Sequence, residues 1–230
     1  MAYILHIDTS GDTGIVAISK DGMLLSSIEN ADTRNHAATI NLHIAKVLAN
    51  ADITMPLLDA IAVCGGPGSY TGLRIGLATA KGLCYILDKP LMMHNRLLLM
   101  TLKHYYENLK IYGFYAATLT AREKECYFAS YNNKLEPVIE PRHFLDDELG
   151  EIRELLASKS LLTGDITDNI NNIFSDDDHQ LVSENTIDIN SWCRYAFDRF
   201  TSNEFVNLAA AEPFYLKQVF THKQKDINKL

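Results

Sequence analysis

The order of predicted elements repeats between the two halves of the chain, and this repeat restricts the possible fold more than any other feature. In the first half, apolar patterns predict strands at 3–8, 14–19, 23–28, 59–64 and 91–94, with helices at 34–51, 71–87 and 96–106. The second half predicts strands at 111–119, 126–131, 135–139, 160–163 and 180–183, with helices at 146–158 and 189–199. We therefore predict an α/β protein with two related lobes, residues 1–108 and 109–230, each a mixed sheet flanked by helices.

Two copies of this element order describe the actin-like architecture, which is also called ASKHA and is ribonuclease H-like. In such folds a nucleotide usually lies in the cleft between the lobes. Periodicity alone does not separate this architecture from other α/β folds. The composition, 47% hydrophobic and 22% charged residues, is that of an ordinary globular protein.

The sequence also predicts where the protein works. Its first residues lack the basic start, apolar run and cleavage site of a secretory signal, and no apolar stretch approaches the roughly 20 residues that span a bilayer. We expect a soluble, cytoplasmic protein with no membrane contact.

The cysteines are too scattered for a metal knuckle or a disulfide framework; they are Cys64, Cys84, Cys126 and Cys193. A net charge of −8 disfavours unaided binding to RNA.

A glycine-rich stretch at residues 65–76, GGPGSYTGLRIG, follows a predicted strand and opens a predicted helix. Backbone N–H groups and the helix dipole hold anions at such positions. The candidates for contact with a phosphate or nucleotide are Gly66, Gly68, Ser69 and Thr71. The stretch is no Walker loop, because it does not end in Gly-Lys-Ser or Gly-Lys-Thr. A tight strand-to-helix connection without a ligand stays open as the alternative.

The predicted helix that follows is rich in small residues, namely Gly72, Gly76, Ala78, Ala80 and Gly82. Small side chains let another helix approach closely. Each glycine lowers the intrinsic stability of a helix by about 1 kcal/mol relative to alanine. We expect close packing against this helix to compensate for that cost.

Residues 66–76, GPGSYTGLRIG, together with Ala80-Lys81-Gly82, resemble the signature of the TsaB (YeaZ) family. TsaB is a degenerate relative of the tRNA-modifying, glycoprotease-like (M22) protein TsaD. Three further segments resemble the family in the same order, namely Ile7-Asp8-Thr9-Ser10, Arg34-Asn35-His36 and Glu212-Pro213-Phe214-Tyr215-Leu216-Lys217. The resemblance covers most of the chain and is most specific between Asp59 and Pro90.

The resemblance implies a non-catalytic scaffold or activator subunit. Such a subunit binds TsaD as a heterodimer, is joined by the ATPase TsaE, and meets tRNA only through the complex. It helps TsaD to transfer threonylcarbamoyl to N6 of adenosine 37 of tRNA. The helices at 34–51 and 71–87 are then the docking elements, with partner-binding residues Arg34, His36, Ile40, Gly72, Leu73, Gly76, Leu77 and Ala80. No cofactor is expected, although the resemblance allows ATP or ADP at the subunit junction.

The chain departs from the family at two places. Around the first helix, the family's usual His-Ser and Leu-Leu-Pro are His36-Ala37 and Asn41-Leu42-His43 here, which alters the expected partner surface. Where the family commonly has Asp-Ala-Arg, this chain has Thr120-Ala121-Arg122, which puts any role of that Asp in doubt. TsaD uses His-x-x-x-His for its metal, whereas His36 and His43 are seven residues apart and lie roughly 10 Å apart along a helix. We therefore expect no metal site.

Other chemistries have weaker support in the sequence. A two-metal nuclease needs several carboxylates, and only Asp8 and Asp59 are suitably placed. Asp8 is more simply part of a turn that satisfies its own backbone donors. No Gly-x-Ser-x-Gly elbow occurs, and buried packing is favoured over a dyad for Cys64 and His94.

Two other classes of function remain as alternatives. An actin-like ATPase or small-molecule kinase would need an adenosine loop in the second lobe, for which Thr163-Gly164-Asp165 is a thin match. A self-associating module is the third class, because helices that pack closely can form homodimers when the partner is absent.

Overall fold

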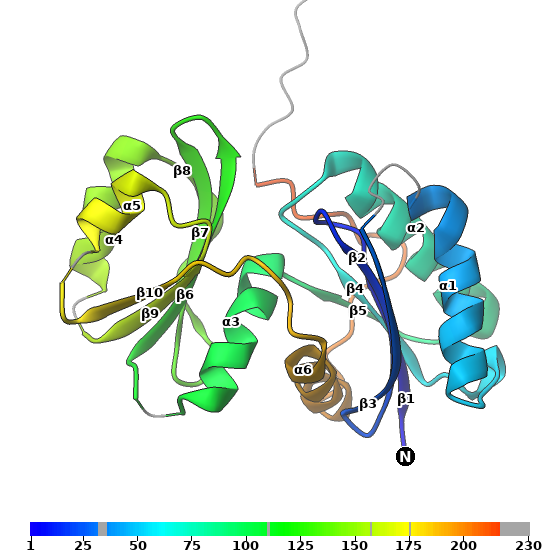
Figure 1. The fold of residues 1–230 in the computed structure, drawn as a ribbon. Coiled ribbons are helices and arrows are strands. Elements are labelled where there is room, and N and C mark those ends of the chain that lie inside the picture. Colours follow the sequence, from blue (N-terminus) through cyan, green and yellow to red (C-terminus); the bar gives the residue numbers. More distant parts are fainter. Residues whose placement is uncertain (32–35, 110, 157, 175, 217–230) are drawn as a thin grey trace, which may run out of the picture.

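The computed structural model describes residues 1–31, 36–109, 111–156, 158–174 and 176–216 (Figure 1). It contains two five-stranded sheets. The strands of the first are β1 (Tyr3–Asp8), β2 (Gly14–Lys20), β3 (Met23–Asn30), β4 (Ala60–Cys64) and β5 (Leu91–His94). The strands of the second are β6 (Phe114–Arg122), β7 (Glu125–Asn132), β8 (Pro137–Leu145), β9 (Ser160–Gly164) and β10 (His179–Val182). The helices are α1 (His36–Asn50), α2 (Tyr70–Leu87), α3 (Arg96–Glu107), α4 (Leu149–Leu155), α5 (Asp168–Ile173) and α6 (Ile189–Thr201), with 3₁₀ turns at Met55–Leu57 and Asp146–Glu148.

Both sheets have the same topology. The strand order is β3-β2-β1-β4-β5 in the first and, read from the other edge, β8-β7-β6-β9-β10 in the second. In each, the first three strands pair antiparallel and the last two add in parallel. The helices follow the same order in each half, since α1, α2 and α3 are succeeded by α4, α5 and α6. The predicted α/β fold with two mixed, helix-flanked sheets is confirmed.

Helices α3 and α6 lie between the two sheets and contact each other (Figure 1). One buried hydrophobic cluster joins them to both sheets, because it contains Ala17 of β2, Leu99 of α3, Ala129 of β7 and Trp192 of α6. A second cluster lies between the first sheet and the helices α1 and α2. A third fills the space between the second sheet and α4 and α5.

The end of the described chain returns to the first sheet, although the sequence assigns it to the second lobe. Helix α6 contacts β1 and β3, and Val206 forms an antiparallel bridge with Leu91 of β5. Farther on, the N–H of Phe214 donates to the carbonyl of Gly65 at 2.8 Å. The division at residues 108 and 109 therefore stays a prediction, and residues 189–216 contribute contacts to the first lobe.

Several predicted boundaries differ from the structure for identifiable reasons. Strand β8 runs to Leu145, past Pro141, whereas the sequence predicts its end at 139. Because β8 is at the edge of its sheet, a proline removes no ladder bond there. Helix α5 is missed by the sequence prediction, since its six residues, DNINNI, are polar and give too short a periodic pattern. Its start is fixed by Thr167, whose side chain accepts from the N–H of Ile170.

Candidate functional site

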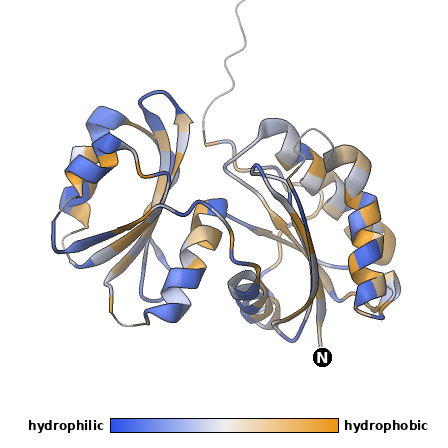
Figure 2. Ribbon diagram, in the orientation of Figure 1, coloured by the Kyte–Doolittle hydropathy of each residue, from blue (hydrophilic) through white to orange (hydrophobic). Residues whose placement is uncertain are grey.

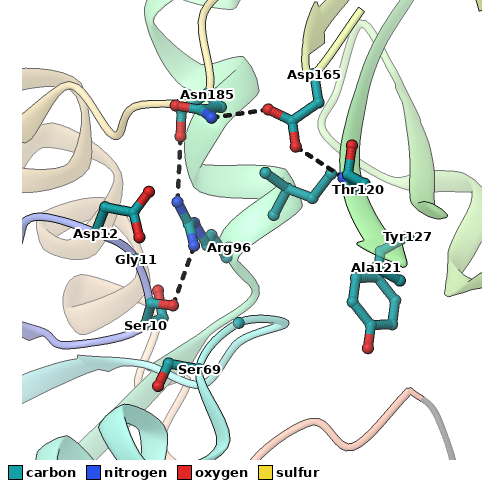
Figure 3. Close-up of a pocket in the computed structure, with 12 residues that line it drawn as sticks. Ser10, Gly11, Asp12, Ser69, Arg96, Thr120, Ala121, Tyr127, Asp165 and Asn185 are labelled. Carbon is teal, nitrogen blue, oxygen red and sulfur yellow. Dashed lines mark hydrogen bonds between the residues drawn. The ribbon is translucent and has the colours of Figure 1, made fainter. Parts of the chain in front are cut away.

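The candidate site is the hollow where the two lobes meet, with a volume of about 480 Å³ (Figure 3). It lies at the carboxyl ends of β1 and β9, where open α/β sheets commonly bind ligands. The residues that line it come from both lobes: Ser10, Gly11, Asp12, Gly68, Ser69, Arg96, Leu119, Thr120, Ala121, Tyr127, Asp165 and Asn185. We refer to this hollow as the cleft.

Of the four residues in the glycine-rich loop that are predicted to contact an anion, two line the cleft. Gly68 and Ser69 line the cleft, whereas Gly66 and Thr71 do not. Gly66 is buried at a φ of +102°, which favours glycine, and its carbonyl accepts from the N–H of Arg96 at 2.6 Å. Contact with a phosphate or nucleotide stays a prediction for all four residues.

The loop uses its own backbone donors within the chain. The N–H of Ser69 donates to the carbonyl of Ser10 at 2.8 Å, and the N–H of Gly72 donates to Ser69 Oγ at 3.2 Å. The N–H of Leu73 donates to the Ser69 carbonyl. These bonds hold the loop against the turn after β1, as in the tight strand-to-helix connection left open above.

The turn after β1 is also satisfied internally. Asp8 Oδ1 accepts the N–H of Ser10 at 2.8 Å, as expected for a turn that satisfies its own donors. Within the described ranges, no group of three or more His, Cys, Asp and Glu side chains is placed to hold a metal ion. Asp59, the other carboxylate considered, accepts the N–H of Tyr3 at the opposite end of β1.

Cys64 and His94 are strand neighbours that bond to different groups. Cys64 Sγ lies 3.3 Å from Ser10 Oγ, and His94 Nδ1 accepts from Trp192 Nε1 at 2.9 Å. Burial raises the pKa of the Cys64 thiol and lowers the pKa of His94 to about 3, so both side chains are neutral near pH 7. The structure thus matches the packing role that the sequence favours over a dyad.

Most of the predicted partner-binding residues point into their own lobe. Ile40, Gly72, Leu73, Gly76, Leu77 and Ala80 are buried. A Cβ at Gly72 would overlap the carbonyl oxygen of Thr9, and one at Gly76 would overlap Thr9 Oγ1. The small residues at 72 and 76 therefore allow α2 to pack closely against β1, which corrects the idea that they form an outward docking face. Arg34 and the side chain of His36 lie outside the described residues.

The outward side of the same two helices carries exposed apolar residues that sequence reasoning missed. Leu42 of α1 is 53% exposed, and on α2 Tyr85 and Ile86 are 82% and 79% exposed. Exposed small residues extend this surface at helical spacing; they are Ala38, Ala45, Ala49, Ala78 and Gly82. We call these eight residues the helical face. In Figure 2, α1 carries more hydrophobic colour than α4 or α5.

Two segments that carry the family resemblance meet in space, although they are far apart in the sequence. Lys81 Nζ donates to the carbonyls of Ala209 and Ala211 at 3.2 and 3.1 Å, and Arg74 Nε donates to the hydroxyl of Tyr215 at 3.0 Å. The ring of Phe214 covers Gly65, where a Cβ would lie 2.7 Å from it. These contacts hold the end of the described chain against α2 and the glycine-rich loop.

The second-lobe segment considered as an adenosine loop has a different set of contacts. Asp165 Oδ1 accepts from Asn185 Nδ2 and Asp165 Oδ2 accepts from the N–H of Thr120, both at 2.7 Å. At Gly164, a Cβ would overlap the carbonyl oxygen of Thr118. Thr120, where the family commonly has Asp, therefore lies in the cleft and contributes its backbone to this network.

In the part of the chain that the structure covers, no helix is long and apolar enough to cross a bilayer. The family model described as TsaD, tRNA N6-adenosine threonylcarbamoyltransferase, matches residues 24–166, which is more than half of the chain. The tRNA N6-adenosine threonylcarbamoyltransferase of Staphylococcus aureus (strain bovine RF122 / ET3-1) is 29% identical over 170 residues, covering 67% of this chain and 49% of that protein. The chain thus spans about half the length of the curated relatives it matches.

The structure is similar to several solved structures. YeaZ from Pseudomonas aeruginosa has a TM-score of 0.79 and 22% identity, covering 94% of this chain and 100% of that chain. The inorganic polyphosphate/ATP-glucomannokinase from Arthrobacter sp. strain KM has a TM-score of 0.54 and 13% identity, covering 88% and 100%. Both likenesses show a shared fold, which confirms the predicted actin-like architecture. The chain belongs to the family described as TsaD, tRNA N6-adenosine threonylcarbamoyltransferase, and its fold within that family is that of YeaZ (TsaB), the resemblance that the sequence carries.

Proposed function

We propose that this chain is a non-catalytic subunit that binds TsaD and supports the transfer of threonylcarbamoyl to N6 of adenosine 37 of tRNA. The family match supports a role in tRNA modification. The observation that carries the finer proposal is the exposed pair Tyr85 and Ile86 on α2, within the helical face. Large apolar side chains exposed side by side mark surfaces that bind another protein.

The occupant of the helical face follows from the family relation. TsaD contains a region related to residues 24–166, which includes α1 and α2. Two related chains can therefore pair the same helices across a pseudo-twofold axis, with each helix layer covering the other. We place docking on the outward residues Leu42, Ala78, Tyr85 and Ile86, in place of the buried residues that the sequence favoured.

The contacts of the glycine-rich loop also favour a scaffold over an ATPase or kinase. The backbone donors of Ser69 and Gly72 are engaged within the chain. An ATP-dependent enzyme would need such donors for its phosphates. We accordingly propose that the chain has no turnover of its own, that it acts in the cytoplasm, and that it reaches TsaE and tRNA only through the complex. Its helical face would form a homodimer when TsaD is absent.

Charge introduced into the helical face tests this docking. We expect the Ile86→Asp variant to bind TsaD from the same genome about 100-fold more weakly, because a carboxylate would lose water without gaining a partner. The matched control is Leu155→Asp, which changes a leucine that is 58% exposed on α4 in the other lobe. Its affinity should stay within about twofold of the original chain.

Isothermal titration calorimetry would give both dissociation constants, and circular dichroism would check that each variant is folded. Since Ile86 is 79% exposed, its substitution should leave the lobe intact. Equal affinities for Ile86→Asp and the original chain would show that TsaD does not dock on this face.

A further inference from the structure

The chain passes between the two sheets at two places. The first crossing is from β5 to α3, which contacts β6, β7 and β9, and the second is residues 183–188, from β10 to α6. Lobes joined by such connections move relative to each other by default, unless the interface between them is large and hydrophobic. In this protein, hydrogen bonds on the floor of the cleft tie the two crossings together.

Arg96, the first residue of α3, joins the first lobe to the second crossing. Its Nη1 donates to the carbonyl of Ser10 at 3.1 Å, and its Nη2 donates to the carbonyl of Asn185 at 3.3 Å. The guanidinium lies against Gly11, where a Cβ would be 2.7 Å from Nη2. A charged donor shared between two carbonyls gives stronger bonds than a neutral group would.

Asn185 extends the connection into the second lobe. Its Nδ2 donates to Asp165 Oδ1 at 2.7 Å, and Asp165 Oδ2 accepts the N–H of Thr120 at 2.7 Å. Figure 3 shows the resulting path from Ser10 through Arg96, Asn185 and Asp165 to Thr120. Hydrogen bonds therefore link both lobes through side chains of residues that line the cleft.

The second crossing is attached at a further point. Lys103 Nζ of α3 lies 3.0 Å from both carboxylate oxygens of Glu184, and Thr163 Oγ1 donates to the Glu184 carbonyl at 2.7 Å. The hydrophobic cluster that joins both sheets through α3 and α6 includes Ile187 of this crossing. The crossing is thus held from α3 on one side and from β9 on the other.

We propose that Arg96 is a positioning residue that fixes the angle between the lobes, so that the helical face and the second lobe are presented to TsaD in one orientation. The presentation to TsaD rests on the proposed function, whereas the fixed angle is a property of the free chain alone. Loss of Arg96 would leave the helical face unchanged, because that face belongs entirely to α1 and α2. Docking would survive, and stimulation of TsaD would fall.

The test uses the full chain with Arg96→Met, beside the control Arg142→Met, which removes the same charge from an exposed position on β8. Spin labels at Met23→Cys and Glu154→Cys report the distance between the lobes. We expect a wider distance distribution for Arg96→Met and about tenfold faster amide exchange at Thr120, with no change for the control. Unchanged distances and exchange would overturn the proposal.

Two further measurements separate this proposal from the proposed function. In complex with TsaD, Arg96→Met should keep its affinity within about twofold and lower the modification rate about tenfold. An unaltered modification rate, despite wider distances, would overturn the role of the angle. Asn185→Ala serves as the second variant in case Arg96→Met does not fold, and Arg96→Lys should restore part of the rate. Failure of the original chain to bind TsaD would refute only the proposed function, since the distances need no partner.

Discussion

Replacing Gly72 by alanine is expected to lower the free energy of unfolding by about 2–4 kcal/mol. The added Cβ would overlap the carbonyl oxygen of Thr9, which is backbone and has little freedom to move. Thr9 Oγ1 also donates to the carbonyl of Gly72 at 2.6 Å, so the two segments are tied at this point. Relief of the overlap would require α2 to move away from β1.

Gly82 offers a matched control on the same helix. A Cβ there would meet no atom within 4 Å, and Gly82 is exposed in the interior of α2. Gly82→Ala should therefore raise the free energy of unfolding by about 0.5–1 kcal/mol, through the helix propensity of alanine. Urea denaturation measures both changes, and a loss of similar size in the two variants would contradict the packing described here.

The second large effect is a loss of stability in mild acid. His6 and His94 are buried beside Trp192. Burial, with a smaller contribution from His94 to His6 and from Arg199 to His94, lowers the pKa of each to about 3. Because the unfolded chain binds protons at a pKa near 6.5, both rings stabilise the fold above pH 6.5, and this stability is lost as the pH falls towards 3. The loss should reach about 2.7 kcal/mol per pH unit when both rings contribute.

A single variant separates the histidines from other groups. His94→Gln keeps an acceptor for Trp192 Nε1 but removes one of the two histidine pKa values that are lowered to about 3. Its free energy of unfolding should fall with about half the slope of the original chain between pH 6.5 and 5, a range above the titration of ordinary carboxylates. Urea denaturation at four or five pH values would measure the slopes. An unchanged slope would show that His94 does not carry the effect.

Much of the fold could be predicted from the sequence because its elements have strong periodicity. The strands of the first sheet and the helices α1 to α3 lie within a few residues of their predicted ranges. The repeated order then indicates two similar lobes. The prediction fails where the local pattern is short or polar, as in α5, and where an edge strand tolerates Pro141.

The site was predicted less well, since its contacts depend on tertiary structure. Periodicity shows that Gly72, Gly76 and Ala80 share one face of α2, yet it does not show whether that face turns to β1 or to a partner. The same limit applies to Lys81, whose acceptors at Ala209 and Ala211 are more than a hundred residues away. A bulky side chain at position 76 would therefore disturb the fold itself, because its Cβ would meet Thr9 Oγ1.

Reconstituted tRNA modification tests the central claim most directly. TsaD and TsaE from the same genome would be incubated with threonylcarbamoyl-adenylate, ATP and an unmodified tRNA that reads codons starting with A, with and without this chain. We expect no modification by this chain alone, and at least about tenfold faster threonylcarbamoylation of adenosine 37 when it is added to the other two proteins. An equal rate with and without the chain, or modification by the chain alone, would contradict its role as a non-catalytic subunit.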